Sequence, residues 1–462
     1  MRKLQYAAFA VVTAGVLAAL AAMAFATGPA KGDQQGSVPK ETREIVKAIS
    51  ADNIQSSIHT LVGFGTRHTL SSQTDPNRGI GAATQWVFGQ FQQIAATSGG
   101  RMTVEKQSFV QPAGPRIPTP TVITNVIATL RGSQPESVGR TYLVSGHLDS
   151  RCTDVLDFTC DAPGAGDDGS GVGAVLEMAR VMATHEFDAT IKFVAFSGEE
   201  QGTFGSVFYA AQAKAAGENI AGMFSNDIIG SSLGQNGERD RHDVRLFADG
   251  PPPNETPAEA TIRRTMGGEN DTPARELARF IRDEAEPAVP TMNVWIIYRR
   301  DRFLRGSDHG PFLDQRYPAV RFTEPNEDFR HEHQNVRVEN GVQFGDLEQF
   351  LDYNYIANVA RVNAAALAAL ANGPAAPQNV KVEASTLSTD TQLEWQANTE
   401  PDLAGYEIVY RDTTEPFWTN VIKVGNVSSY TVKNITKDNF LFGVRAVDTD
   451  GNRSVVTFPV PK

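Results

Sequence analysis

The sequence predicts an α/β fold, with a mixed, mostly parallel sheet sandwiched by helices, followed by an all-β sandwich. Through most of the chain, apolar runs of strand length alternate with segments whose apolar residues recur at helical spacing. Such alternation builds a largely parallel sheet with helices on its faces. After Gly373 the pattern changes to short runs of alternating polarity between turn residues, which is typical of a β-sandwich. The sequence therefore predicts two folded domains.

The first residues have the features of a targeting segment. A basic region at residues 1–3 precedes an apolar run at residues 7–22, and Ala24-Phe25-Ala26 gives a small-residue cleavage pattern. We interpret residues 1–26 as a secretory signal peptide. An uncleaved anchor is the alternative, because the run approaches the length of about 20 residues that spans a bilayer. Residues 27–40 are polar and contain Gly and Pro, so they predict a linker.

Composition and cysteine usage restrict the function further. The formal net charge is -12 at pH 7, which argues against nucleic-acid binding. No later stretch is apolar and long enough for stable membrane insertion, so we expect an exported protein, periplasmic or extracellular. Cys152 and Cys160 would form a disulfide in an oxidising compartment. Free thiols or a soft-metal site are the alternatives, although two cysteines alone suit structural zinc poorly.

The first elements surround the start of the predicted sheet. Apolar spacing predicts two short helices in residues 41–62, with a break near residues 51–53, and one helix over residues 82–96. Alternating polarity predicts strands at residues 104–110 and 122–130, and the second would pair beside the strand that ends at Gly146.

Three further apolar runs predict central strands, and each stops at polar residues. The runs are Tyr142–Gly146, Ile191–Phe196 and Ile220–Asn226. They are followed by His147-Leu148-Asp149, by Ser197-Gly198-Glu199-Glu200 and by Asp227. A glycine-rich turn with Asp167 lies after the first strand and opens a predicted helix. Because ligands bind outside the carboxyl ends of such strands, we expect these side chains to meet at one edge of the sheet.

The remaining elements complete the larger predicted domain, residues 41–372. They are helices at residues 203–216 and 274–286, strands at 292–298 and 318–322, and a closing helix at 346–370. Residues 234–257 are rich in Gly, Pro and charged residues, and they predict a long loop.

The residue types at the predicted edge suit a metal. Carboxylates and imidazoles without thiolates favour zinc, or a harder ion such as manganese. Asp149 lies two residues after His147, so its carboxylate could accept the other ring N–H of that histidine. Asp167, which lies in the glycine-rich turn, could bridge two ions. One carboxylate of the Glu199-Glu200 pair could hold metal while the other acts as a base.

A second imidazole is needed to complete a two-metal site. The candidates are His331 and His333, far along the chain. Residues two apart face opposite sides of an extended segment, so we expect only one of them to reach the metal.

These motifs together resemble the co-catalytic di-zinc exopeptidases of the bacterial leucyl-aminopeptidase type, whose superfamily includes glutamate carboxypeptidase II and glutaminyl cyclases. Each motif is weak alone, but their order and spacing match over roughly residues 40 to 370. The matching stretches are GHLDS (146–150), GDDGSG (166–171), SGEEQGTFGS (197–206), SND (225–227) and HEHQ (331–334).

The resemblance implies a role for each residue and two zinc ions per chain. Glu199 resembles the general base. The residues that look like zinc ligands are His147, Asp167 as the bridging carboxylate, Glu200, Asp227 and His333. We choose His333 over His331 because it precedes a polar residue and a loop. Asp308 and His309 lie in a segment, residues 306–312, that resembles the family's substrate side, and a direct ligand role for His309 is the weaker interpretation.

The resemblance also implies a function. We expect a zinc-dependent aminopeptidase that acts on peptides. A carboxypeptidase or a glutaminyl cyclase could use the same residues, and Arg299, Arg300, Arg302 and Arg305 could bind a substrate carboxylate, although surface charge is the simpler interpretation. A non-enzymatic binding protein is a further alternative, but no expected ligand is missing from this sequence.

The C-terminal region follows a predicted linker at residues 373–378. Residues 379–462 resemble a fibronectin type III domain through Trp395, Tyr406 and Phe442, and the resemblance implies no chemistry and no particular partner. The predicted strands are residues 380–382, 391–395, 405–410, 422–424, 429–432, 440–447 and 455–458.

Overall fold

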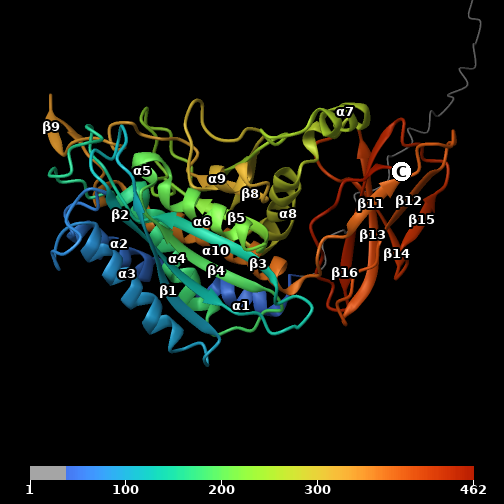
Figure 1. Cartoon of the computed structure of the whole chain (residues 1–462), viewed down its shortest axis with the longest axis horizontal. Helices are drawn as coiled ribbons and strands as arrows, with labels where there is room; N and C mark the ends of the chain where they lie inside the picture. The colour runs from blue at the N-terminus through green and yellow to red at the C-terminus, as the bar shows by residue number, and fades with distance from the viewer. Residues whose placement is uncertain (1–37) are drawn as a thin grey trace, which may run out of the picture. The chain divides into compact units, whose positions relative to one another are not determined.

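The computed structural model describes residues 38–462, and an eight-stranded mixed sheet forms the centre of the larger part (Figure 1). The strand order is β1-β2-β4-β3-β5-β8-β6-β7. The strands are β1 (Met102–Gln111), β2 (Thr121–Leu130), β3 (Arg140–His147), β4 (Thr190–Phe196), β5 (Asn219–Asn226), β6 (Asp243–Ala248), β7 (Asn293–Ile297) and β8 (Ala319–Thr323). The predicted signal peptide and residues 27–37 of the predicted linker lie outside the described residues.

The four central strands, β4, β3, β5 and β8, are parallel to one another. Every residue of β3 is buried, as expected for a parallel strand covered on both faces. The carboxyl ends of β3, β4 and β5 therefore lie at the same edge of the sheet. The prediction of a mixed, mostly parallel sheet with helices on both faces is confirmed.

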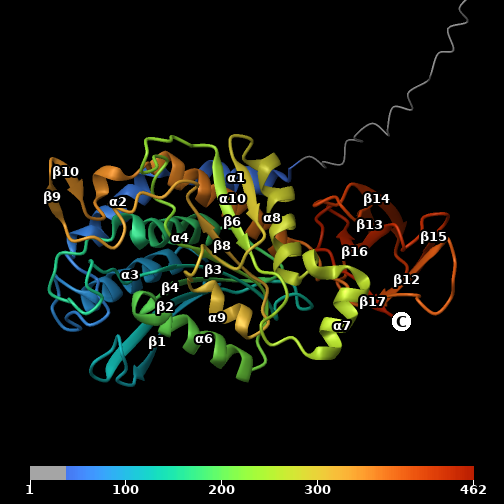
Figure 2. The ribbon, with the colours of Figure 1, turned by 90° about the horizontal axis from the view of Figure 1, so that it is seen from above.

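Alternate residues of the central strands pack into different cores. Val144 and Phe193 belong to one apolar cluster, while Leu143 and Val194 belong to the other. This is the period of two that a buried strand imposes. The larger cluster includes side chains from α1 (Lys40–Ala48), α2 (Ala51–Gly63), α3 (Ile80–Ala95), α4 (Ser170–Met182), α8 (Pro273–Ala288) and α10 (Tyr353–Asn372). The smaller cluster contains α6 (Phe204–Ala215) and α9 (His309–Asp314), which lie side by side (Figure 2).

The predicted loop at residues 234–257 is wrong in its middle, because it contains β6. This strand pairs with both β7 and β8 inside the sheet. Its buried Val244 and Leu246 alternate with polar residues, but charged residues and prolines surround this short signal. Helix α7 (Pro257–Met266) was also not predicted, because it has no buried residue and hence no apolar stripe. Its capping box, Thr256 with Glu259, was the sequence signal that marked it.

The C-terminal region consists of two sheets whose strand pairs are antiparallel except for the parallel pair β11–β17, so the prediction of an all-β region is confirmed. One sheet has the order β15-β12-β11-β17 and the other β14-β13-β16. The strands are β11 (Gln378–Val382), β12 (Thr391–Gln396), β13 (Leu403–Asp412), β14 (Asn420–Gly425), β15 (Ser429–Val432), β16 (Phe440–Asp448) and β17 (Val460–Pro461). Trp395, Tyr406 and Phe442 pack together in its core. The resemblance to fibronectin type III stays a prediction.

Among the helices of residues 38–462, none combines the length and the apolar composition that a bilayer crossing needs.

Candidate metal centre

The carboxylate of Asp167 lies between two imidazoles. Its Oδ1 is 2.9 Å from Nε2 of His147, which is the last residue of β3. Its Oδ2 is 2.8 Å from Nε2 of His333, which follows β8 by a loop. The two oxygens of one carboxylate thus face two different histidines. This is the arrangement that a bridging ligand of two cations requires.

A second carboxylate accompanies each imidazole. Asp227, the first residue after β5, places Oδ1 3.8 Å from Nε2 of His147. Glu200 places Oε2 3.1 Å from Nε2 of His333. Donor atoms of His147, Asp167 and Asp227 lie within 4.8 Å of one another, which is close enough to share one ion. The structure therefore brings together all five residues that the sequence nominates as metal ligands.

Oε1 of Glu200 is buried and lacks a hydrogen-bond partner in the described part of the chain. Buried polar atoms are nearly always satisfied, so this oxygen fits a ligand of a cation. Burial opposes charge on both rings, yet Asp167 and its neighbouring carboxylates raise the pKa of His147 well above its usual value and that of His333 to about 10. The donor set of imidazoles and carboxylates suits zinc.

Glu199 precedes the candidate ligand Glu200 at the start of a short helix, α5 (Glu199–Gly202). Gly198 before it has a positive φ of 77°, so the chain turns sharply where β4 ends. Burial is the first of the causes that raise the pKa of the Glu199 carboxyl well above its usual range, and Asp227 and Glu200 add to it. A carboxylate in such a setting holds a proton more readily than one in water.

Asp149 contributes differently from the prediction. Nδ1 of His147 is 3.1 Å from the backbone oxygen of Asp149, whereas the Asp149 carboxylate is 3.8 Å away. The carboxylate instead accepts hydrogen bonds from the backbone N–H groups of Glu199 (3.1 Å) and Glu200 (3.0 Å). Asp149 thus orients the imidazole through its main chain, and its side chain fixes the backbone of the glutamate pair.

Two further acidic residues hold the turn that carries Asp167, and sequence reasoning missed both. Asp346 accepts hydrogen bonds from the backbone N–H groups of Gly166 and Asp167, each at 2.7 Å. Asp168, joined to Asp167 by a cis peptide bond, accepts from the backbone N–H of His147 at 2.8 Å. Asp346 was assigned to the closing helix, which in fact begins at Tyr353. Its role depends on a contact across the fold that no local pattern signals.

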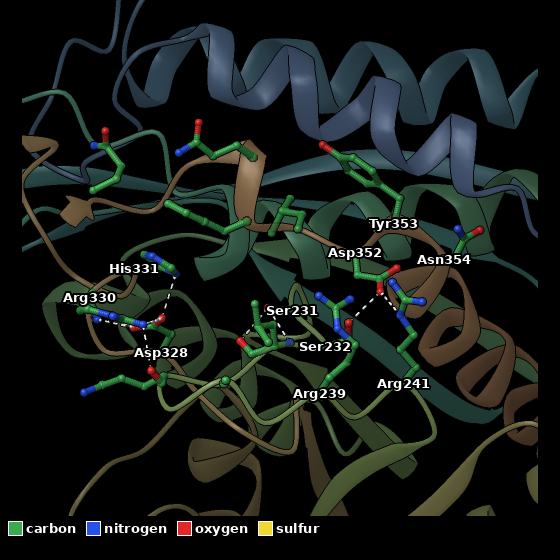
Figure 3. Close-up of a pocket in the computed structure, with 18 of the residues that line it drawn as sticks. Ser231, Ser232, Arg239, Arg241, Asp328, Arg330, His331, Asp352, Tyr353 and Asn354 are labelled. Carbon is green, nitrogen blue, oxygen red and sulfur yellow. Dashed lines mark hydrogen bonds and ion pairs between the residues drawn. The ribbon is translucent and has the colours of Figure 1, made fainter. Parts of the chain in front are cut away.

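His331 points to a different environment from His333. Its ring stacks on Phe350 with 3.5 Å between ring centroids, and its Nδ1 is 3.5 Å from Asp328. It lines a pocket of about 740 Å³ beside Arg330 and Asp328 (Figure 3). His333, in contrast, contacts both Asp167 and Glu200.

Three of the four arginines that could have bound a substrate carboxylate are paired with acids of the chain, and the fourth, Arg299, lies over the ring of Phe303. Glu327 contacts both Arg302 and Arg305, each at 3.0 Å. Arg305 also contacts Glu332, and Arg300 lies 2.7 Å from Asp314. Because these charges are already matched, the surface-charge interpretation fits Arg300, Arg302 and Arg305 better than a carboxylate site does.

Asp308 and His309 have separate surroundings. Asp308 accepts a hydrogen bond from Ser206 at 2.6 Å, and burial raises its pKa to about 7. The Nε2 atom of His309 is 2.7 Å from the backbone oxygen of Arg300. This ring nitrogen of His309 therefore has a partner in the main chain, and the role of His309 stays a prediction.

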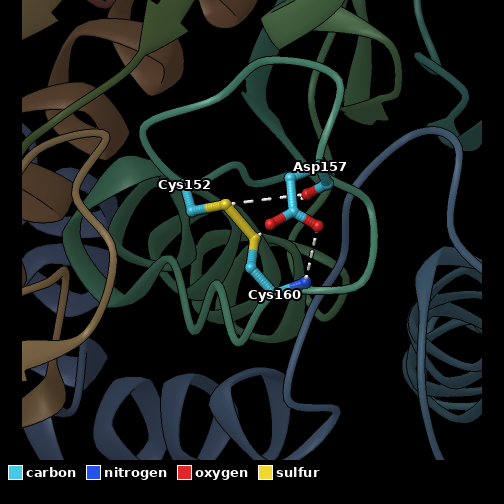
Figure 4. A group of neighbouring side chains, drawn as sticks. All are labelled: Cys152, Asp157 and Cys160. Carbon is cyan, nitrogen blue, oxygen red and sulfur yellow. Dashed lines mark hydrogen bonds between the residues drawn. A yellow bond between two sulfur atoms is a disulfide. The ribbon is translucent and has the colours of Figure 1, made fainter.

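The disulfide prediction is confirmed, because Cys152 and Cys160 are joined by an S–S bond of 1.99 Å (Figure 4). Their sulfurs are bonded to each other, so this group with Asp157 offers no thiolates to a metal. The closed loop also contacts the segment of His333: Thr153 and Asn335 exchange two hydrogen bonds, at 3.0 and 3.1 Å. The loop that the disulfide closes therefore contacts the segment that carries His333.

Known proteins resemble this chain in sequence and in fold. A model of peptidase family M28 matches residues 125–337. A probable zinc metalloprotease of Leptosphaeria maculans is 48% identical over 423 residues, which cover 91% of this chain and 97% of that protein. Another, of Pyricularia oryzae, is 51% identical over 414 residues, covering 88% and 82%. The LapA aminopeptidase structure of Legionella pneumophila shares the fold, with a TM-score of 0.51 and 19% identity over 72% of this chain and 76% of that one.

Proposed function

The chain belongs to peptidase family M28 and is a zinc metalloprotease, and from this premise we propose that it is an aminopeptidase that uses two zinc ions. The observation that carries the proposal is the position of Asp167, with one oxygen toward His147 and the other toward His333. Asp227 and Glu200 supply one further carboxylate to each side. Such a set provides ligands for two ions that share a bridge.

Glu199 is the proposed general base and acid. Zinc, when bound, polarises a peptide carbonyl and lowers the pKa of water from about 15.7 toward 7. The Glu199 carboxylate takes a proton from the attacking water and later delivers it to the departing amine, so the peptide C–N bond breaks as the new C–O bond forms. The hydrogen bonds from the Glu199 and Glu200 backbone to Asp149 keep this carboxylate beside the ligand Glu200.

The charge around the centre supports an aminopeptidase over a carboxypeptidase. A carboxypeptidase needs a free cation to bind the C-terminal carboxylate, and three of the four candidate arginines, Arg300, Arg302 and Arg305, already contact acids of the chain. A free α-ammonium, in contrast, is attracted to a site rich in carboxylates. A glutaminyl cyclase would act on the same free amine, so the substrate panel below includes N-terminal glutamine.

The test is a panel of matched peptides with free and acetylated amino termini, assayed with and without a chelator. We expect release of the first residue from free peptides only, lost on chelation and restored by zinc. Cleavage of acetylated peptides from the C-terminal end would contradict the aminopeptidase proposal. Formation of pyroglutamate without hydrolysis would assign the chain to the cyclase alternative.

The export and domain proposals rest on the sequence and on the disulfide. We propose that residues 1–26 direct export and are removed, that residues 41–372 are the catalytic domain, and that residues 379–462 are a separate sandwich. Determination of the N-terminal residue of the exported protein tests the first point: a start at Met1 would contradict cleavage.

A further inference from the structure

A buried arginine contacts one of the two sides of the proposed zinc centre. Arg321 lies on β8 and is 0% exposed. Its Nη2 is 2.9 Å from Oδ1 of Asp227, and it also donates to the backbone oxygen of Asp227 at 3.2 Å. The guanidinium thus occupies the same carboxylate oxygen that faces His147.

The charge of Arg321 is only partly balanced by other acids. Its Nη1 lies 2.9 and 3.0 Å from the two oxygens of Asp301. Asp301 is shared, however, because Nε of Arg302 is 3.3 Å from the same Oδ1 atom. Arg302 and Arg321 therefore share the single negative charge of Asp301, which leaves part of the Arg321 charge to pair with Asp227.

The side of the centre that contains Glu200 and His333 has different ion pairs. Oε2 of Glu200 contacts His333, and its Oε1 has no hydrogen-bond partner in the described part of the chain. The nearby Arg302 and Arg305 contact Glu327, a further acid that lies outside the ligand set. In the described part of the chain, no guanidinium forms an ion pair with the Glu200 carboxylate, whereas Asp227 pairs with Arg321.

We propose that Arg321 makes the two zinc positions unequal, so that the ion between Asp167, Glu200 and His333 binds tightly and the ion between Asp167, Asp227 and His147 binds weakly. A guanidinium in contact with a ligand carboxylate repels a dication and occupies one of the carboxylate lone pairs, and both effects are large away from bulk water. The proposal rests on the two-zinc site. Arg321 acts through Asp227, so it is a positioning residue.

The test measures zinc content directly. The wild-type protein is dialysed against chelators of increasing strength, and the zinc remaining per chain is determined by mass spectrometry. We expect release in two steps, the first at chelator strengths at least about tenfold weaker than the second. His147→Asn should bind a single ion at the strength of the second step, which assigns the weak ion to the His147 side.

Paired variants isolate the charge of Arg321. In D301N/R321Q the arginine and its second acid are both made neutral, so no buried carboxylate loses its only partner. We expect the first step to move at least about tenfold toward the second. R321K retains the charge and should keep two well-separated steps.

The outcomes separate this proposal from the function it rests on. Release of both ions from the wild type in one step, or an unmoved first step in folded D301N/R321Q, would overturn the role of Arg321 and leave the two-zinc enzyme intact. If D301N/R321Q does not fold, the single variant R321Q replaces it, and an unmoved first step in R321Q would overturn the role of Arg321. A wild-type protein that never binds zinc would overturn the proposed centre itself.

Discussion

Two buried regions of this protein are rich in acids, and they differ in what faces those acids. At the contact between α8 and the C-terminal sheets, Asp271 lies 3.2 Å from Arg279 and 2.5 Å from Arg411. At the candidate metal centre, the close partners of the Asp167 carboxylate are the imidazoles of His147 and His333. Both acids are removed from water, but Asp271 faces permanently charged guanidinium groups, whereas Asp167 faces imidazoles, which can lose their protons.

The type of partner distinguishes buried acids that stabilise the fold from buried acids that could bind a metal. A buried carboxylate that faces a guanidinium is balanced in every state of the protein. A group of carboxylates balanced only by imidazoles, which give up their protons to bind metal, attracts a cation from solution. Asp227 combines both patterns, because it faces His147 and Arg321 together. Changes at the metal centre should therefore affect turnover and zinc binding, whereas changes at the contact with the C-terminal sheets should affect stability.

The largest effect is expected from Glu199→Gln at the metal centre. The variant keeps the ligands but removes the group that moves protons, so kcat should fall by about 10²–10⁴-fold while zinc content stays unchanged. Peptide hydrolysis and metal analysis on the same sample measure both. Glu186→Gln, at an exposed glutamate, is the matched control and should retain full activity. Near-normal turnover by Glu199→Gln would remove this residue from the mechanism.

The next effect is expected at the contact with the C-terminal sheets. Arg140 lies 3.2 Å from Glu400, and both side chains are 5% exposed. Arg140→Met leaves Glu400 buried without its cation, which should lower the free energy of unfolding by roughly 3–5 kcal/mol and leave zinc content unchanged. Urea denaturation checks the stability. The double variant R140M/E400Q should recover much of the loss, and a failure to recover would mean that the pair does not act through charge.

Metal removal should have an intermediate effect on stability. An ion at a hundredfold of its dissociation constant stabilises a folded protein by about 2.7 kcal/mol. Chelation should therefore lower the melting temperature of the wild type, and zinc should restore it. Asp167→Asn weakens both zinc positions at once, so its melting temperature should respond little to either treatment. An equal zinc response in Asp167→Asn would show that the stabilising ion binds elsewhere.

The smallest effect is a pH dependence at Glu276. Burial, with Asp271 nearby, raises its pKa to about 8 although Arg279 opposes the shift. Between its usual value of 4.5 and about 8, the folded state holds this proton and the unfolded state does not, so stability falls as pH rises through that window. Glu276→Gln removes this contribution. From pH 5 to 9, the melting temperature of the variant should therefore change less with pH than that of the wild type. An equal pH dependence in both proteins would contradict the assignment.

The sequence predicts the parts of this molecule that carry strong local patterns. β3, β4 and β5 are visible as continuous apolar runs, and His147, Glu200 and Asp227 follow them directly. β6 was missed because its buried residues, Val244 and Leu246 to Ala248, form a short apolar signal between stretches rich in charged residues and proline. Strand ends can therefore be assigned from the sequence wherever the strand is buried on both faces.

The partners of the ligands were beyond sequence reasoning. Arg321 reaches Asp227 across a distance of 94 residues, and Asp346 reaches Asp167 across 179. Arg321 lies beside Asp227 because β8 pairs with β5. Asp346 lies beside Asp167 because the chain returns to that turn before α10 begins. Asp149 was placed correctly near His147, but which of its oxygens faces the ring depends on the turn into α5. Such contacts follow from the tertiary structure alone.

Anomalous diffraction at the zinc absorption edge, from crystals grown with excess zinc, tests the central claim most directly. We predict two peaks, one on each side of the Asp167 carboxylate, with His147 and Asp227 at the first and His333 and Glu200 at the second. Crystals without a peak beside Asp167, or with zinc bound only outside this ligand set, would contradict the account.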